Sequence, residues 1–155
     1  MGISVLVVDA NVENGKHIKN SLEASNLFQV TLATRAIEAL MRFTETRFQV
    51  AIIDFGLPDL NGADLIRQIR GIDESAIIVA VLKDSKTKPP EIKKLPVNLI
   101  LDKPAHLSYL QQYYSLLLMY LYQRARLCHR QGFLRLLWYL CLRLLHQHLL
   151  LPGKC

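Results

Sequence analysis

The sequence predicts an α/β fold of three layers, in which a five-stranded parallel sheet lies between helices. Five short runs rich in Val, Ile and Leu have the length and composition of buried strands. Stretches whose apolar residues recur at helical spacing separate most of these runs. Strands that alternate with helices in this way favour parallel pairing and right-handed crossovers. The chain of 155 residues, 51% of them hydrophobic, is long enough to bury such a core.

The five predicted strands follow one another along the first two thirds of the chain. Most are near-continuous apolar runs, which indicate strands that are buried on both faces, whereas the second run alternates between apolar and polar residues. Polar, glycine or proline residues follow each run and end the strand. The predicted strands are Ile3–Val8, Phe28–Ala33, Val50–Ile53, Ala76–Leu82 and Val97–Leu101.

The connecting helices are predicted from apolar residues spaced three and four apart. They are Gly15–Ser25, Arg35–Thr46, Ala63–Arg70 and His106–Tyr122. The polar segment Asn11–Asn14 is expected to be a loop, and Thr34 is expected to cap the second helix. We expect that helix to bury Ile37, Leu40, Met41 and Phe43. Pro89 and Pro90 exclude a regular helix interior over Lys86–Lys94, so this connection should be short or distorted.

Asp54 stands at the end of the third predicted strand and begins a distinctive loop. The apolar run Val50–Ile53 leads directly into Asp54, and the sequence G-L-P-D-L-N-G follows before the next helix. In open α/β sheets, ligands bind at the carboxyl ends of the strands. A lone carboxylate at such a place can accept a phosphoryl group, bind a metal ion or cap a helix.

The pattern D-x-x-L-P-x-L-N-G from Asp54 to Gly62 resembles the phosphoacceptor loop of the two-component receiver domains, the CheY-like family. The resemblance covers residues 3 to about 120. It implies a flavodoxin-like strand order with the site beside the first strand. It also implies phosphorelay signalling, in which Asp54 accepts a phosphoryl group from a histidine kinase or a phosphotransfer protein, and a signalling domain that is not itself an enzyme.

Asp9, Asp54 and Lys103 each stand at the end of a predicted strand, so they should meet at one edge of the sheet. A phosphoryl acceptor needs a carboxylate nucleophile and a divalent cation, and it gains from a fixed ammonium group. We expect Asp54 to be phosphorylated, Asp9 and Asp54 to hold Mg²⁺, and Lys103 to pair with Asp54 or with the phosphate. Lys103-Pro104 also resembles the family, in which this bond is commonly cis.

Three positions depart from the family pattern. Receivers carry two adjacent acids after the first strand, but here Ala10 follows Asp9, so the more direct metal ligand is missing. Asn11 could offer one neutral oxygen, and Mg²⁺ is expected to bind weakly. Val81 replaces the Thr or Ser that contacts the phosphoryl group, and Ile100 replaces the switch aromatic. Two alternatives follow: a phosphoacceptor, or a pseudo-receiver that acts as an interaction module without phosphorylation.

Charge is distributed unevenly along the chain, which has a formal net charge of +6. Acidic residues end at Asp102, and residues 1–102 hold 12 Lys and Arg against all 13 Asp and Glu, a balance of −1. Residues 103–155 hold the other seven basic residues and no acid, a balance of +7. This asymmetry suggests two parts with different roles. We predict a receiver-like domain over 1–122 and a basic, Leu-rich helical tail over 123–155.

The tail is unusually apolar. Within Phe133–Leu151, polar residues recur at steps of three and four on one helical stripe, and the rest of the circumference is apolar. Such a helix suits contact with a partner or a second copy of the chain, and it equally suits a membrane surface, through residues 123–151. Arg135 and Arg143 argue against a transmembrane span. A third account is that the tail is a remnant that is not selected for folding.

The cysteines and the basic residues of the tail indicate the expected location and partners of the protein. The three cysteines, Cys128, Cys141 and Cys155, are odd in number and far apart, so they predict neither a disulfide framework nor a zinc site. A reducing cytoplasm is the expected location, with association at a membrane surface as the alternative. Basic residues are sparse among the leucines of the tail, and no helix-turn-helix or zinc finger pattern is visible. Nucleic-acid binding is therefore not expected.

Overall fold

A five-stranded parallel sheet forms the centre of the computed structural model, which describes residues 2–24, 26, 28–83 and 89–103. The strand order is β2-β1-β3-β4-β5, so the direction of winding reverses between β1 and β3. The flavodoxin-like order predicted from the sequence is therefore confirmed. The strands are β1 (Ile3–Val8), β2 (Phe28–Ala33), β3 (Val50–Asp54), β4 (Ile77–Leu82) and β5 (Leu99–Asp102).

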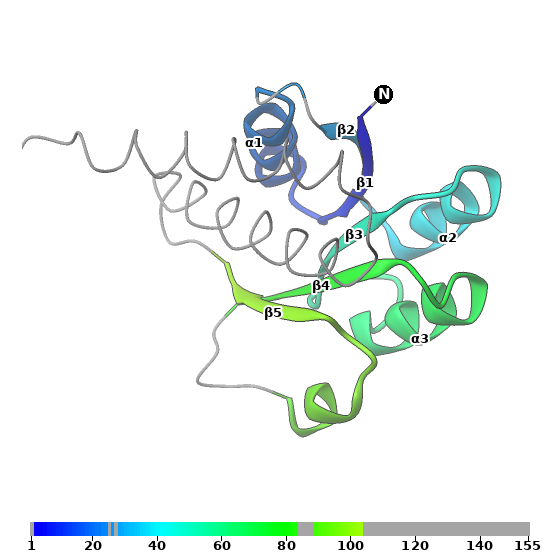
Figure 1. Ribbon diagram of the computed structural model, residues 1–155. Helices are drawn as coiled ribbons and strands as arrows, with labels where there is room; N and C mark the ends of the chain where they lie inside the picture. Colours follow the sequence, from blue (N-terminus) through cyan, green and yellow to red (C-terminus); the bar gives the residue numbers. More distant parts are fainter. Residues whose placement is uncertain (1, 25, 27, 84–88, 104–155) are drawn as a thin grey trace, which may run out of the picture. The chain divides into compact units, whose positions relative to one another are not determined.

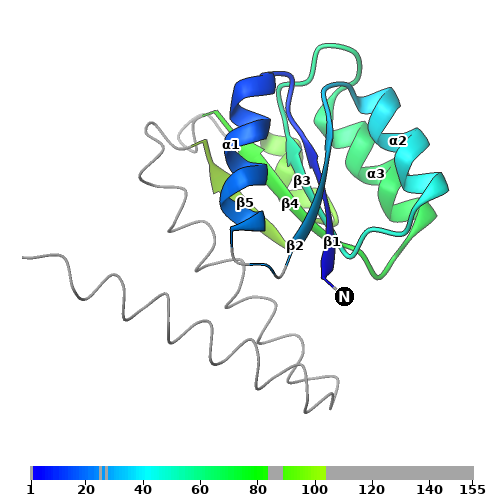
Figure 2. The ribbon, with the colours of Figure 1, turned by 90° about the horizontal axis from the view of Figure 1, so that it is seen from above.

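Helices cover both faces of the sheet, as the three-layer prediction requires (Figures 1 and 2). Helix α1 (Val12–Glu23) lies on one face, whereas α2 (Ala36–Glu45) and α3 (Gly62–Ile72) lie side by side on the other. Each helix returns the chain to the start of the next parallel strand, which is the crossover that parallel pairing demands. Every strand consequently ends at the same edge of the sheet.

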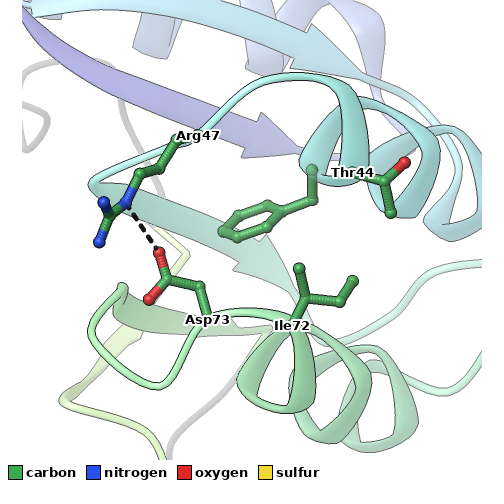
Figure 3. A pocket seen from close by; sticks show the side chains of 5 residues that line it. Thr44, Arg47, Ile72 and Asp73 are labelled. Atoms are coloured by element: carbon green, nitrogen blue, oxygen red, sulfur yellow. Dashed lines mark hydrogen bonds and ion pairs between the residues drawn. The ribbon is translucent and has the colours of Figure 1, made fainter.

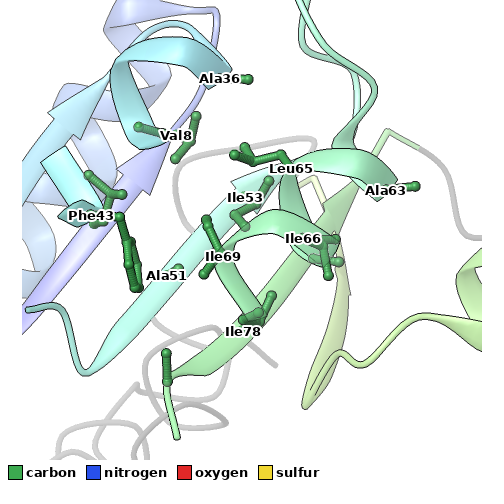
Figure 4. Packing of buried hydrophobic residues seen from close by; sticks show 14 of the residues in the cluster. Val8, Ala36, Phe43, Ala51, Ile53, Ala63, Leu65, Ile66, Ile69 and Ile78 are labelled. Atoms are coloured by element: carbon green, nitrogen blue, oxygen red, sulfur yellow. The ribbon is translucent and has the colours of Figure 1, made fainter. Parts of the chain in front are cut away.

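The main apolar core lies between the sheet and the pair α2 and α3 (Figure 4). Ile53 of β3 and Ile78 of β4 point into it from the sheet, and both are fully buried. Helix α3 contributes Leu65, Ile66 and Ile69, which recur at helical spacing on its buried side. Full burial of each such side chain stabilises the fold by about 1.5–3 kcal/mol. This packing holds the carboxyl end of β3 in a fixed position.

Helix α1 begins earlier than the sequence analysis predicted. The segment expected to be a polar loop is instead a capped first turn that starts at Val12. The side-chain oxygen of Asn11 accepts hydrogen bonds from the backbone N–H groups of Glu13 (3.0 Å) and Asn14 (3.2 Å). These two donors would otherwise lack a partner at a helix start, so the polar residues form the helix terminus.

The buried side of α2 also differs from the predicted one. Phe43 is buried as expected, but Ile37 and Met41 are 61% and 60% exposed. Ala36 and Ala39 occupy the inward stripe instead and are fully buried. Small side chains let the helix lie close to the sheet, and this close approach sets which face points inward.

The connection before β5 contains a 3-10 helix, Pro90–Lys94, in the place where the two prolines predicted a short or distorted helix. Ile92 and Leu95 are buried and anchor it to the core. The predicted helix His106–Tyr122 and the tail, together with the domain boundary between them, lie outside the described residues. Within the described part of the chain, no helix is long and apolar enough to cross a membrane.

Gly62 begins α3 in close contact with the loop that follows β3. A Cβ atom at this position would lie 2.8 Å from the Cα atom of Phe55 and 3.0 Å from its carbonyl oxygen, and both are backbone atoms that cannot rotate away. The glycine of the loop motif is therefore required by packing. Gly71, in the same helix, has no atom within 4 Å of the corresponding Cβ position among the residues that the structure describes.

Gly62→Ala should lower the free energy of unfolding by about 1–3 kcal/mol, because the added methyl group forces the backbone of Phe55 to shift. Gly71→Ala is the matched control and should stabilise the protein by up to about 1 kcal/mol, since alanine favours the helix. Urea denaturation of the two variants and the wild type measures both values. Equal effects of the two substitutions would show that the start of α3 is not tightly packed.

Candidate functional site

Three charged residues meet at the carboxyl edge of the sheet, next to the point where the winding reverses. Asp9 follows β1, Asp54 ends β3 and Lys103 follows β5. The backbone fixes these strand ends, since the N–H of Asp9 donates to the carbonyl oxygen of Ala33 (3.1 Å) and that of Lys103 to Leu82 (2.6 Å). The residues that the sequence analysis grouped together are thus brought together by the fold.

Lys103 contacts both carboxylates. Its Nζ atom lies 2.5 Å from Oδ2 of Asp54 and 3.5 Å from Oδ1 of Asp9. Asp9 and Asp54 are 5% and 6% exposed, so they have given up most of their hydration. Two buried carboxylates with no nearby cation would be strongly unfavourable. The ammonium group of Lys103 therefore offsets part of the negative charge of the two acids.

Each of the four carboxylate oxygens also has a hydrogen-bond donor. The backbone N–H of Gly56 donates to Oδ1 of Asp54 (3.1 Å), whose Oδ2 contacts Lys103. The backbone N–H of Asn11 donates to Oδ1 of Asp9 (2.8 Å), and the amide Nδ2 of Asn14 donates to its Oδ2 (3.2 Å). Buried carboxylates are stabilised by such a complete set of donors.

Asn14 is a site residue that the sequence analysis missed. It is the third residue of α1, and helical side chains near the N-terminus point back toward the preceding loop. The signal was present in the sequence, because Asn14 lies three residues after Asn11, at the spacing of a capped turn. The signal was not used because the segment was predicted to be a loop.

The positions that depart from the family pattern carry hydrocarbon side chains at the places the sequence analysis expected. Val81 is paired in register with Asp54 and is buried. Ile100 is partly buried and packs against the main core. Ala10 is exposed beside Asp9, and the side-chain oxygen of Asn11 is used to cap α1. Valine and isoleucine side chains cannot donate or accept a hydrogen bond, so they do not supply the hydroxyl or the aromatic ring that the resemblance to the family implies at these positions.

The two aspartates have the donor chemistry that Mg²⁺ prefers, and a resident cation, the ammonium of Lys103, already lies between them. The residues therefore fit a divalent cation in kind. They are few in number, since the described part of the chain has no group of three or more His, Cys, Asp or Glu side chains placed to hold a metal. The Lys103–Pro104 bond, expected to be cis, includes a residue outside the described part.

Asp59, in the loop between β3 and α3, holds that loop against the start of α2. Its two carboxylate oxygens accept hydrogen bonds from the backbone N–H groups of Ala36 (2.9 Å) and Ile37 (3.1 Å). The N-cap residue of α2 is Arg35 and not the predicted Thr34, whose backbone N–H donates to Glu38 (3.1 Å). The bonds from Ala36 and Ile37 hold the pKa of the Asp59 carboxyl below its ordinary value.

A hollow of about 310 Å³ lies at the opposite edge of the sheet, where α2 and α3 end (Figure 3). Arg47 and Asp73 form an ion pair of 3.4 Å across it. A hydrogen bond from Ser75 is the main cause that lowers the pKa of Asp73. These polar groups are engaged with one another, so the hollow is a poorer candidate site than the pocket of Asp54. Its lining comprises Phe43, Thr44, Arg47, Ile72 and Asp73.

Comparison with known proteins identifies the family. Residues 5–115 match the family model described as the response regulator receiver domain. The chain belongs to this family. The match covers well over half of the chain, and it contains all three charged residues of the pocket.

Curated relatives of this receiver domain are regulatory proteins. The virulence transcriptional regulatory protein PhoP of Salmonella typhimurium is 34% identical over 105 residues, which are 67% of this chain and 46% of that protein. The regulatory protein VanRB of Enterococcus faecalis is 32% identical over 82 residues, which are 51% and 36% of the two chains. The chain spans about half the length of the curated relatives that it matches, or less.

Solved structures agree with the fold. A CheY-like receiver domain from Methylobacillus flagellatus is 23% identical with a TM-score of 0.63, over 74% of this chain and 97% of that one. The response regulator TrrA of Thermotoga maritima, solved with Mg²⁺-BeF, is 20% identical with a TM-score of 0.63, over 74% and 96%. The predicted family and the predicted CheY-like fold are both confirmed for this receiver domain.

Asp59→Ala should lower the stability of the protein at pH 7, because α2 then begins with two backbone N–H groups that have lost their acceptor. Folding lowers the pKa of the Asp59 carboxyl from its unfolded value of about 3.8. The carboxylate therefore stabilises the folded protein fully above about pH 3.8, and this stabilisation is lost as the pH falls through the lower folded pKa. The difference in melting temperature between wild type and variant should therefore shrink below about pH 4.

Thermal melts between pH 3 and pH 7 measure this difference. Asp64→Ala is the control, because that carboxylate pairs with the exposed Arg67 and can lose this pair with little effect. A difference for Asp59→Ala that stays constant down to pH 3, or one no larger than that of Asp64→Ala, would show that Asp59 does not cap α2 in solution.

Proposed function

We propose that this receiver domain accepts a phosphoryl group on Asp54 from a histidine kinase or a phosphotransfer protein, and that it acts as a signalling domain and not as an enzyme. The observation that carries the proposal is the contact of Lys103 with a buried Asp54 at the point where the sheet reverses its winding. Ligands of open α/β sheets bind at this point. The similarity to the regulatory proteins PhoP and VanRB supports a place in a two-component pathway.

The chemistry is a displacement at phosphorus. A carboxylate oxygen of Asp54 forms the new P–O bond while the P–N bond of a phosphohistidine donor breaks, and the released imidazole takes up a proton. The backbone N–H of Gly56 holds the Asp54 carboxylate in place. The ammonium of Lys103 lies close enough to stabilise the negative charge that gathers on the phosphoryl oxygens.

Asp9 and Asp54 would hold Mg²⁺, which supplies further positive charge to the phosphoryl oxygens when bound. With Ala10 in place of a second adjacent acid, the affinity for Mg²⁺ should be low. Two structures of the same fold support this proposal. The TrrA structure contains Mg²⁺-BeF. A response regulator of Burkholderia pseudomallei was solved with a phosphorylated aspartate and a calcium ion; it is 24% identical with a TM-score of 0.61, over 68% of this chain and 62% of that one.

The second candidate is a pseudo-receiver that binds a partner without phosphorylation. The observation in its favour is that all four carboxylate oxygens of Asp9 and Asp54 already have donors, while Val81 and Ile100 carry hydrocarbon side chains. In this account the chain docks to a partner protein, a second copy or a membrane surface through residues 123–151. In both accounts the proposed location is the cytoplasm, and nucleic acid is not a proposed partner.

Incubation with acetyl phosphate and Mg²⁺, followed by intact-mass measurement, tests the first candidate. Wild-type protein should gain one phosphoryl group, and Asp54→Asn should gain none. Asp102→Asn is the matched control, because it removes an exposed aspartate that lies next to Lys103 in sequence. A folded wild-type protein that gains no mass at any Mg²⁺ concentration would contradict phosphoacceptor function and favour the pseudo-receiver.

Ala10→Asp should tighten Mg²⁺ binding by roughly tenfold or more, because it restores a carboxylate next to Asp9. Ala24→Asp introduces the same charge at an exposed position at the far end of α1 and should leave the affinity unchanged. Isothermal titration with MgCl₂ measures both constants. Identical affinities for the two variants would mean that the pocket does not hold the cation through Asp9 and its neighbour.

A further inference from the structure

We infer that Asn14 supplies a third protein ligand for a divalent cation, together with Asp9 and Asp54, in place of the acid that is missing at Ala10. The inference deepens the proposed function and rests on it, because it takes this pocket to be the one that holds the cation. The side chain that replaces the missing carboxylate would thus come from one turn into α1 and not from the residue next to Asp9.

Asn14 has the required position. Its Nδ2 atom lies 3.2 Å from Oδ2 of Asp9, which is the carboxylate oxygen farther from Lys103. A half-turn of the carboxamide about its Cβ–Cγ bond exchanges the nitrogen for Oδ1, an oxygen ligand that hard cations accept. Asn11, the residue first considered for this role, has already committed its side-chain oxygen to two backbone N–H groups of α1.

The separation of Asn14 and Asp9 suits two ligands of one ion. Mg²⁺ binds oxygen at about 2.0–2.1 Å, so two neighbouring ligand oxygens on one ion lie about 2.9 Å apart. The observed 3.2 Å between the Asn14 amide and Asp9 is close to that separation. Asp9 stands between the other two groups: Asn14 contacts its Oδ2 atom, and Lys103 contacts both its Oδ1 atom and Asp54.

The charges are consistent with this arrangement. Asp9, Asp54 and Lys103 together carry a net charge of −1 in a mostly buried pocket. A divalent cation would take over the contact that Lys103 makes with Asp9, which is the longer and weaker of its two contacts. A neutral amide oxygen binds a hard cation less strongly than a carboxylate oxygen does. An aspartate at position 14 should therefore bind the ion more tightly than the asparagine.

Isothermal titration of the full chain with MgCl₂ tests the inference. Asn14→Ala removes the ligand and should weaken Mg²⁺ binding by roughly tenfold, whereas Asn14→Asp, which has nearly the same shape, should tighten it by roughly tenfold. Asn20→Ala and Asn20→Asp make the same changes at an exposed position of the same helix and should leave the affinity unchanged. Circular dichroism verifies that α1 remains folded, and Asn14→Asp decides the outcome if Asn14→Ala unfolds.

Two results would overturn the inference: equal Mg²⁺ affinity for Asn14→Asp and Asn20→Asp, or no Mg²⁺ binding by the folded wild-type protein. The titration needs no phosphoryl donor, so its outcome is separate from that of the proposed function. A protein that is never phosphorylated but shows the Asn14 shifts retains the cation site without the signalling chemistry. A protein that is phosphorylated while the Asn14 variants bind Mg²⁺ like the Asn20 variants has the function without this ligand.

Discussion

The contact of one ammonium group with two buried carboxylates is the interaction on which the site depends. Lys103 approaches Asp54 to 2.5 Å and Asp9 to 3.5 Å, and both acids are almost fully removed from water. Charges buried to this extent persist only when they are paired and hydrogen-bonded. The sheet satisfies that condition because three parallel strand ends deliver the three side chains to one place. The arrangement of the strands therefore determines which charged side chains meet at the carboxyl edge of the sheet.

The pocket groups one ammonium with two carboxylates and offers no hydroxyl or aromatic ring at Val81 and Ile100. Asp54, the N–H of Gly56 and Lys103 are arranged around one point, whereas Val81 and Ile100 carry only hydrocarbon. The loop that follows β3 also contacts α2, because Asp59 of this loop accepts hydrogen bonds from the first two backbone N–H groups of that helix. The sequence departs from the family pattern on both sides of the pocket, at Ala10 beside Asp9 and at Val81 and Ile100 on β4 and β5.

The sequence predicted those features of the fold that depend on residues close together in the chain. The continuous apolar runs predicted the strands, the strand ends predicted the meeting of Asp9, Asp54 and Lys103, and the prolines predicted the distorted connection before β5. Contacts between distant segments could not be predicted in this way. Asp59 caps a helix that begins 23 residues earlier in the chain, and no local pattern announces that bond. Met41 was predicted to be buried but is exposed. The spacing of apolar residues in α2 fits more than one buried face, and the observed one contains the alanines Ala36 and Ala39.

A double-mutant cycle tests the central claim, that Lys103 neutralises Asp54 inside the fold. Urea denaturation would give the free energy of unfolding for wild type, Lys103→Met, Asp54→Asn and the double variant. Removal of one partner from a buried pair costs about 3–5 kcal/mol, so Lys103→Met should be strongly destabilising in the wild type. The account predicts that Lys103→Met lowers the free energy of unfolding by about 1 kcal/mol or more less in the Asp54→Asn background than in the wild type. An equal loss in both backgrounds would contradict it.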